Sequence, residues 1–212
     1  MPFKSEWFEY PDIAALYQKY GVLATEKKSD GSPHYTLPLI HDESTGRFIS
    51  GSTFIAKYLD ETYPDTPKLF HPGTDALIRA YDVAYLKQIA AVFPFVSLKT
   101  YSFLNARSVE HFQKKLAAGN KELEGDERSA QWAKVEQGLA VVDSWWGKGD
   151  EFVMGDTLSF ADIITGSWLV WVRTVIGEED EEWKQVTSWQ DGRWGKLLKK
   201  LDGYRDSDVS PR

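Results

Sequence analysis

Residues 34–41 combine an apolar strand pattern with a proline in its middle, and this combination restricts the fold more than any other feature of the chain. A proline inside an apolar strand is unusual because it removes one hydrogen-bond donor of the sheet. It is tolerated where the strand ends against a ligand site, and a cis Leu37–Pro38 bond would turn the preceding backbone outward. A helix is predicted to begin shortly afterwards at Ser52, whose hydroxyl and free N–H groups can hold a carboxylate.

Composition excludes several classes of protein. The 212 residues are 42% hydrophobic, which is typical of a packed globular chain, and carry a net charge of −7. An acidic surface argues against nucleic-acid binding and against anionic membrane surfaces. The chain has no Cys and no apolar run of transmembrane length, so we expect a cytoplasmic protein without disulfides. The four His residues show no ligand spacing, so no metal is expected.

The first third of the chain has the short, alternating patterns of an α/β unit. Phe3 to Tyr10 is strand-like, and a helix is predicted from Ile13 up to Gly21. A hairpin of 35–41 and 47–50 follows, and then a helix over 52–62.

Prolines and a glycine over 64–73 predict a linker between two domains, 1–63 and 74–212. The second domain is predicted to be all helical. The expected helices are one long or Pro94-kinked helix over 75–104, and further helices over 126–148, 159–177, 183–186 and 194–204. The acidic run 178–182 is expected to be a solvated helix start.

The run Gly155-Asp156-Thr157-Leu158-Ser159-Phe160-Ala161-Asp162 predicts a capping box, in which the side chains of Ser159 and Asp162 each bond the other's backbone N–H. Together with the Leu37–Pro38 strand, the helix at Ser52 and the linker, this run resembles the glutathione S-transferase superfamily. The resemblance covers nearly the whole chain. It implies a truncated thioredoxin-like N-terminal domain followed by an all-helical C-terminal domain.

Three further segments resemble a fungal subgroup related to bacterial lignin β-etherases. They are Glu9–Ile13, Thr36–Pro38 and Tyr58–Pro64. The subgroup implies a serine-type transferase that binds aromatic molecules, including phenolics derived from wood.

The resemblance assigns glutathione-binding roles to six residues. The backbone of Leu37, before a cis Pro38, would hold the cysteinyl part, and Ser52 would hold the γ-glutamyl carboxylate. Relatives usually carry Glu or Asp before this serine, where the acid pairs with the γ-glutamyl ammonium. Gly51 stands there instead, which is expected to weaken binding by about 1–3 kcal/mol. Lys28 and His34 lie in the loop that often holds the glycyl carboxylate.

No catalytic residue is assigned. In relatives, a Ser, Tyr or Cys after the first strand stabilises the glutathione thiolate, but Phe3–Tyr10 resembles the second strand, and nothing in the sequence corresponds to the first strand and helix. Three explanations stay open: an incomplete sequence, an unstable or mispaired product, or a repacked protein stabilised by dimerisation or strand exchange.

The resemblance further implies a hydrophobic aromatic acceptor bound between the domains. The candidate wall residues are Tyr85, Phe93, Phe95, Tyr101 and Trp171. The expected activity is glutathione conjugation or ether cleavage, if a thiolate stabiliser is present. The alternatives are a ligandin-like binder of aromatic compounds and a regulatory protein with a transferase fold. A homodimer is expected.

Overall fold

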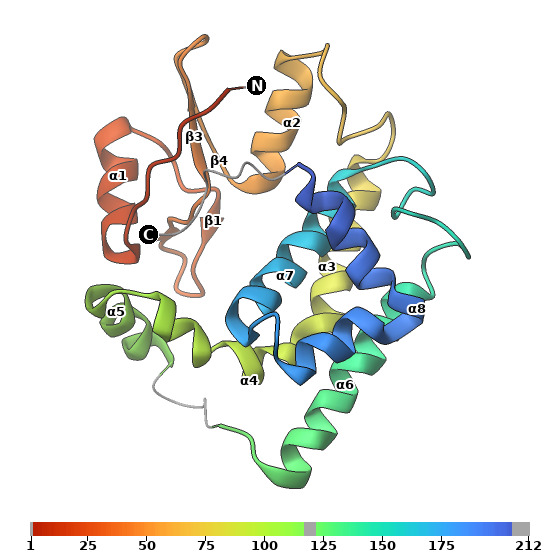
Figure 1. The fold of residues 1–212 in the computed structure, drawn as a ribbon. Helices are drawn as coiled ribbons and strands as arrows, with labels where there is room; N and C mark the ends of the chain where they lie inside the picture. Colours follow the sequence, from red (N-terminus) through yellow and green to blue (C-terminus); the bar gives the residue numbers. More distant parts are fainter. Residues whose placement is uncertain (1, 117–121, 205–212) are drawn as a thin grey trace. The chain divides into compact units, whose positions relative to one another are not determined.

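The chain divides into two compact units in the computed structural model, which describes residues 2–116 and 122–204 (Figure 1). The first unit comprises 1–70 and 105–115, and the second comprises 71–104 and 116–212. The division between Phe70 and His71 lies inside the predicted linker, whereas the grouping of 105–115 with the first unit was not predicted.

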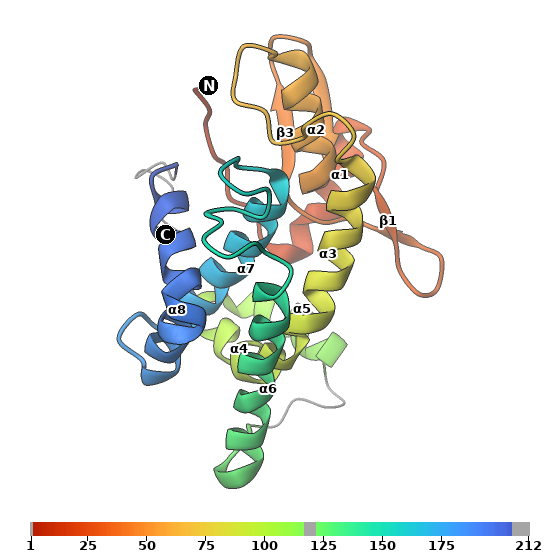
Figure 2. The ribbon, with the colours of Figure 1, turned by 90° about the vertical axis from the view of Figure 1, so that its right-hand side faces the viewer.

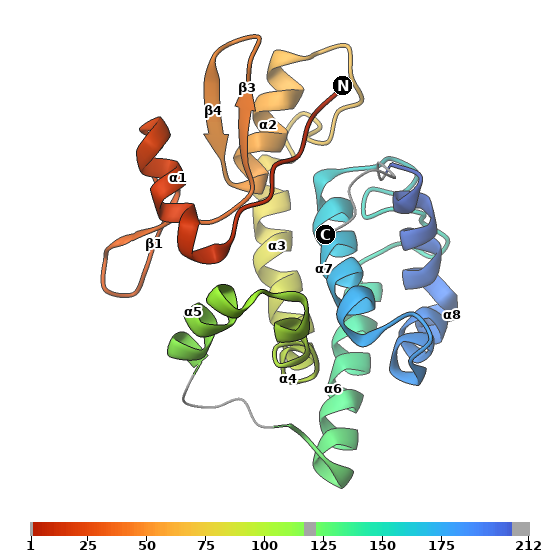
Figure 3. The same cartoon turned by 60° about the vertical axis from the view of Figure 1, so that its left-hand side comes forward.

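Helices and two small antiparallel sheets make up the first unit (Figure 3). Its elements are the 3₁₀ helix η1 (Tyr10–Asp12), α1 (Ile13–Tyr20), β1 (Glu26–Lys27), β2 (Pro33–His34), β3 (Leu39–Asp42), β4 (Arg47–Ser50), α2 (Ser52–Thr62) and α5 (Ala106–Leu116). Strand β1 pairs with β2, and β3 pairs with β4 in a hairpin that contacts α2. The bounds of α2, Ser52–Thr62, confirm the helix predicted over 52–62.

The prediction of a strand over Phe3–Tyr10 is wrong. Residues 2–9 form no regular element, and the side chains of Phe3 and Trp7 are 67% and 63% exposed. A strand needs a neighbour to accept its N–H groups, and no strand of the described sheets pairs with this segment.

Helix α5 holds the end of this segment instead. The Tyr10 N–H donates to Ser108 Oγ at 3.3 Å, and the Ser108 hydroxyl donates to the Glu9 carboxylate. The ring of Tyr10 packs edge-on against Phe112, with 4.4 Å between centroids. Helix α5 was missed, although Asn105 was an available signal, because its side chain accepts from the Ser108 N–H at 2.9 Å as a helix cap does.

The second unit is helical in its described residues. It contains α3 (Asp75–Ile89), η2 (Ala90–Val92), α4 (Phe93–Val96), η3 (Lys99–Phe103), α6 (Gly125–Asp143), α7 (Phe160–Ile176) and α8 (Glu181–Asp202). Helix α7 lies between α3 and α8 and contacts both (Figure 2). Helices α3 and α6 approach so closely that a Cβ at Gly138 would lie 2.1 Å from the Gln88 carbonyl oxygen.

One predicted helix in this unit needs correction. The helix expected over 75–104, either long or kinked at Pro94, is divided into four pieces. Pro94 has no N–H to continue the preceding helix and is the second residue of α4. The two helices expected over 183–186 and 194–204 are confirmed as separate helical segments, because residues 189–192 between them are non-helical, although both carry the single label α8. The acidic run does start α8, where the Asp180 carboxylate accepts from the Glu182 N–H at 2.9 Å.

Candidate functional site

The end of the β3–β4 hairpin brings the Leu37–Pro38 step beside the start of α2. The register pairs Leu39 with Ser50, so that the preceding Pro38 faces Gly51, and the Gly51 N–H donates to the Pro38 carbonyl at 3.1 Å. The Leu37–Pro38 bond is cis, as predicted. Leu37 is 40% exposed, so this residue lies at the surface of the unit.

The first turn of α2 offers polar groups at the same place. Ser52 is the first helical residue, its side chain is exposed, and no side-chain hydrogen bond caps the helix. The N-terminal end of a helix carries partial positive charge and N–H groups without helical partners, which favours a carboxylate. The surface formed by Leu37, Pro38, Gly51 and Ser52 is called the hairpin–helix site below.

Gly51 has the backbone that this junction requires. Its φ of +84° is one that residues with a Cβ rarely adopt. An added Cβ would also lie 3.2 Å from Cδ2 of Phe54 and 3.4 Å from Oγ1 of Thr25. Glycine therefore fits the local backbone. In the sequence, Gly51 was treated only as the loss of an acidic side chain, and this conformation was not anticipated.

A buried tyrosine supports the backbone before Leu37. The Tyr17 hydroxyl donates to the Thr36 carbonyl at 2.5 Å, and the ring packs on Tyr35 with 5.0 Å between centroids. Tyr17 is only 1% exposed. Sequence reasoning missed this role, although Tyr17 follows Ile13 by one helical turn on the buried face of α1.

The tip of the hairpin is tied to the other end of α2. One Asp42 carboxylate oxygen accepts from the hydroxyls of Tyr58 and Tyr63 at 2.6 and 2.7 Å, and the other accepts from the N–H and hydroxyl of Ser44. These bonds, with the Tyr58 hydroxyl first, hold the pKa of Asp42 well below its ordinary value. Both ends of the hairpin are thus fixed to α2.

Lys28 and His34 lie on the other small sheet. The Lys28 N–H donates to the Ser32 carbonyl at 2.9 Å in the turn between β1 and β2, and its side chain is exposed. His34 Nδ1 lies 3.3 Å from a carboxylate oxygen of Glu26. Within the described residues, neither contact joins Lys28 or His34 to the hairpin–helix site, so their assignment stays a prediction.

The five predicted acceptor residues fall into two groups. Tyr85 and Phe95 are 0% and 3% exposed, and Phe95 packs edge-on against Trp132, so both rings belong to the core of the second unit. Burial also raises the pKa of Tyr85 well above its usual range. Phe93, Trp171 and Tyr101 are half-buried.

Phe93 and Trp171 belong to an aromatic triad. Phe93 lies 5.7 Å from Trp168 and 5.9 Å from Trp171 between ring centroids, and the two Trp rings are 5.5 Å apart. Trp168 was not predicted, although it sits on the same face of α7 as Trp171. Edge-on and tilted rings of this kind form a rigid apolar surface that is not fully covered.

The capping box at the start of α7 is present. The Asp162 carboxylate accepts from the Ser159 N–H at 2.8 Å and from the Val153 N–H at 2.7 Å. Asp162 is fully buried, and this burial raises its pKa although the hydrogen bonds oppose the effect. The box fixes the start of the central helix of the second unit.

Two classes of function find no support in residues 2–116 and 122–204. No three His, Cys, Asp or Glu side chains there are grouped so as to hold a metal ion. None of the helices described there is long and apolar enough to cross a bilayer.

Comparison with known proteins identifies relatives over most of the chain. A family profile for the glutathione S-transferase C-terminal domain matches residues 76–204. A glutathione S-transferase-like protein of Aspergillus flavus, ustS, is 29% identical over 221 residues, which cover 93% of this chain and 76% of that protein.

Solved structures show the same fold. A glutathione S-transferase of Ceriporiopsis subvermispora in complex with glutathione is 39% identical and superposes with a TM-score of 0.91, covering 99% of this chain and 87% of that one. The transferase GSTFuA3 from Phanerochaete chrysosporium is 38% identical with a TM-score of 0.89, covering 98% and 85%. These matches confirm the predicted fold class, a thioredoxin-like first domain followed by a helical second domain. The chain belongs to the glutathione S-transferase family.

Proposed function

We propose that the first unit binds glutathione at the hairpin–helix site. The observation that carries this proposal is the 3.1 Å bond from the Gly51 N–H to the Pro38 carbonyl, which holds the exposed residue Leu37 close to the exposed residue Ser52. An extended backbone and a helix start then lie side by side. The first can pair with the cysteinyl backbone, and the second can hold the γ-glutamyl carboxylate.

Relatives support the choice of ligand. Two glutathione S-transferases of Ceriporiopsis subvermispora, 39% and 34% identical to this chain, were solved in complex with glutathione. For the glycyl carboxylate we propose Lys28 and His34. On binding, His34 would then either leave Glu26 for the glycyl carboxylate or contact both carboxylates.

Titration calorimetry with glutathione tests the site. Ser52→Ala removes one hydrogen bond to a carboxylate, which is worth about 1.5–3 kcal/mol, so affinity should fall about ten- to a hundredfold. Ser188→Ala in α8 is the matched control, because its hydroxyl bonds the Gln185 carbonyl at 2.8 Å within its own helix. Equal affinity of the wild type and Ser52→Ala would refute the proposed role of the helix start.

We further propose an aromatic acceptor. The half-buried triad of Phe93, Trp168 and Trp171 supports it, because such rings bind other flat apolar rings. In a conjugation reaction the glutathione thiolate sulfur would attack the ring carbon that carries a chlorine, and chloride would leave. That step requires a group that stabilises the thiolate, and none of the described residues is assigned to it.

Two measurements separate the alternatives. Turnover of a chlorinated dinitrobenzene with glutathione distinguishes a transferase from a binder or a regulatory protein. Displacement of a fluorescent dye by phenolic compounds distinguishes a ligandin-like binder from a regulatory protein. A homodimer is proposed as well, and sedimentation velocity tests it by whether the mass is 24.2 kDa or twice that.

A further inference from the structure

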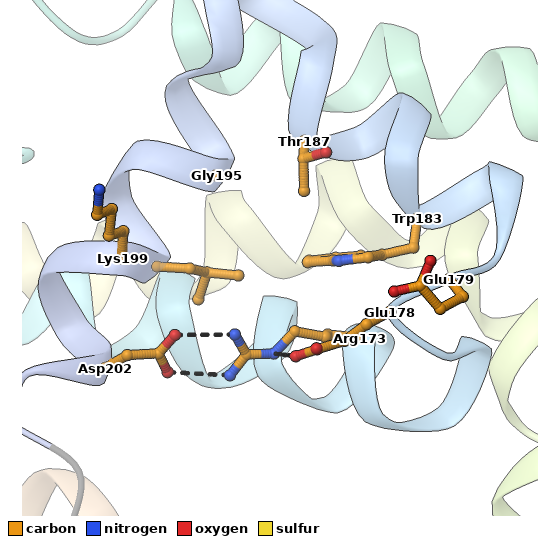
Figure 4. Close-up of a pocket in the computed structure, with 9 residues that line it drawn as sticks. Arg173, Glu178, Glu179, Trp183, Thr187, Gly195, Lys199 and Asp202 are labelled. Carbon is orange, nitrogen blue, oxygen red and sulfur yellow. Dashed lines mark hydrogen bonds and ion pairs between the residues drawn. The ribbon is translucent and has the colours of Figure 1, made fainter.

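A hollow of about 380 Å³ lies in the bend of α8, but the carboxylates that line it are already paired (Figure 4). Arg173 pairs with Asp202 and Glu178, with nitrogen–oxygen distances of 2.9 and 3.5 Å. Glu179 lies 3.8 Å from Lys184 Nζ in the first turn of α8. These pairs leave no charge that would select a ligand. A polar side chain beside the hairpin–helix site differs in this respect.

The side chain of Thr25 lies beside the start of α2. A Cβ added to Gly51 would lie 3.2 Å from Cδ2 of Phe54, 3.4 Å from Oγ1 of Thr25 and 3.7 Å from Cγ2 of Thr25. Of these three nearest atoms, only the hydroxyl oxygen is polar. Thr25 is exposed, and its hydroxyl takes part in no hydrogen bond to another described residue. A polar group is therefore present at the hairpin–helix site and is open to a ligand.

Backbone hydrogen bonds hold both ends of the segment that contains Thr25. The residue directly precedes β1, in which Glu26 is opposite His34 of β2. At the other end, the Val22 N–H donates to the Tyr17 carbonyl at 2.9 Å and ties the segment to α1. The position of the Thr25 hydroxyl is thus set by the fold of the first unit.

The γ-glutamyl end of glutathione carries a carboxylate and an ammonium on the same carbon. Under the proposed function, the carboxylate lies at the first turn of α2, where Ser52 and the N–H groups hold it. The partial positive charge of that turn disfavours an ammonium directly over the same N–H groups, so the ammonium needs an acceptor beside the turn. Residue 51 has no side chain to supply one, whereas the oxygen of the Thr25 hydroxyl can accept from an ammonium.

We propose that Thr25 Oγ1 accepts a hydrogen bond from the γ-glutamyl ammonium of glutathione. This inference rests on the proposed function, because it requires glutathione at the hairpin–helix site. Thr25 is then the residue that distinguishes glutathione from a peptide of the same shape without the ammonium. Since the hydroxyl is uncharged, the preference is smaller than a carboxylate partner would give.

Titration calorimetry of the full chain with two ligands tests the inference. The ligands are glutathione and N-glutaryl-cysteinylglycine, in which a hydrogen replaces the ammonium. We expect the wild type to bind glutathione about tenfold more tightly than the analogue. Thr25→Val keeps the shape of the side chain without its hydroxyl and should bind the two ligands equally, whereas Thr25→Ser should keep the preference.

The outcomes separate this inference from the proposed function. If the wild type binds neither ligand, both are overturned. If it binds glutathione and Thr25→Val keeps the tenfold preference, or weakens both ligands equally, only the role of Thr25 is overturned. Thr25→Ala gives the same comparison if Thr25→Val does not fold.

Two control variants complete the test. Glu26 is the acidic residue next to Thr25 in the chain, and its carboxylate lies 3.3 Å from His34 Nδ1. Glu26→Gln should keep the tenfold preference, and its loss would assign the ammonium to this carboxylate and overturn the role of Thr25. Thr187→Val is the matched control, because the Thr187 hydroxyl donates to the Lys184 carbonyl at 2.9 Å within α8. This variant should bind both ligands as the wild type does.

Discussion

A carboxylate introduced at Gly51 should increase glutathione affinity relative to a matched neutral side chain. The three variants to compare are Gly51→Glu, Gly51→Gln and Gly51→Ala. All three place a Cβ at a φ of +84°, 3.2 Å from Cδ2 of Phe54, so they share the same strain. Only Gly51→Glu adds an anion that can pair with the γ-glutamyl ammonium.

The magnitudes follow from two separate effects. Strain of a side chain in this backbone conformation is about 1–3 kcal/mol, so each variant should be less stable than the wild type by that amount. In a protein of this size the melting temperature then falls by about 2–12 °C. Pairing with the ammonium is worth about 1–3 kcal/mol, or about 5- to 150-fold in affinity.

Calorimetry and thermal melting measure the two effects independently. We expect Gly51→Glu to bind glutathione more tightly than Gly51→Gln and Gly51→Ala, while all three melt at similar temperatures. Gly46→Ala in the hairpin turn is a control for positive φ without crowding, because no atom lies within 4 Å of its added Cβ. Equal affinities of Gly51→Glu and Gly51→Gln would refute the assignment of the ammonium to this position.

Three further predictions concern stability and the site. Gly138→Ala should lower the free energy of unfolding by about 1–2 kcal/mol in urea titrations. The clash of the added Cβ with the Gln88 carbonyl exceeds the gain in helix propensity of about 1 kcal/mol. Gln137→Ala is the neutral control. Folding lowers the pKa of Asp42, so the stability that its carboxylate contributes should be present above its ordinary pKa of 3.8 and lost as the pH falls below that value. Thermal unfolding of Asp42→Asn measured at the same series of acidic pH values should lack this loss. Tyr17→Phe should weaken glutathione binding several-fold by freeing the Thr36 carbonyl, a result that an unchanged affinity would contradict.

Local signals in the sequence predicted the parts of the fold that depend on neighbouring residues. Ser52 and the apolar face after it gave the bounds of α2, and the spacing of Ser159 and Asp162 gave the capping box. The cis bond before Pro38 was predicted as well. In each case the determining interactions lie within a few residues of one another.

Features that depend on distant contacts were not predictable in this way. The segment at Phe3 has a strand-like pattern, but pairing requires a neighbouring strand, and pattern alone does not supply one. Tyr85 and Phe95 have the aromatic spacing of a pocket wall, but burial decided their role. The sequence pattern predicted the interruption between the two halves of α8, but it gave no signal for the Gln190–Trp194 side-chain bond across the bend.

The two attachments of the hairpin to α2 have a consequence for motion. One lies at the Pro38–Gly51 bond and the other at Asp42, with a helix of about 16 Å between them. A segment closed at both ends opens as a whole or not at all, so β3, β4 and α2 should exchange their amide hydrogens as a single cooperative group. Glutathione held at one attachment would then slow exchange at the far one, where it touches nothing.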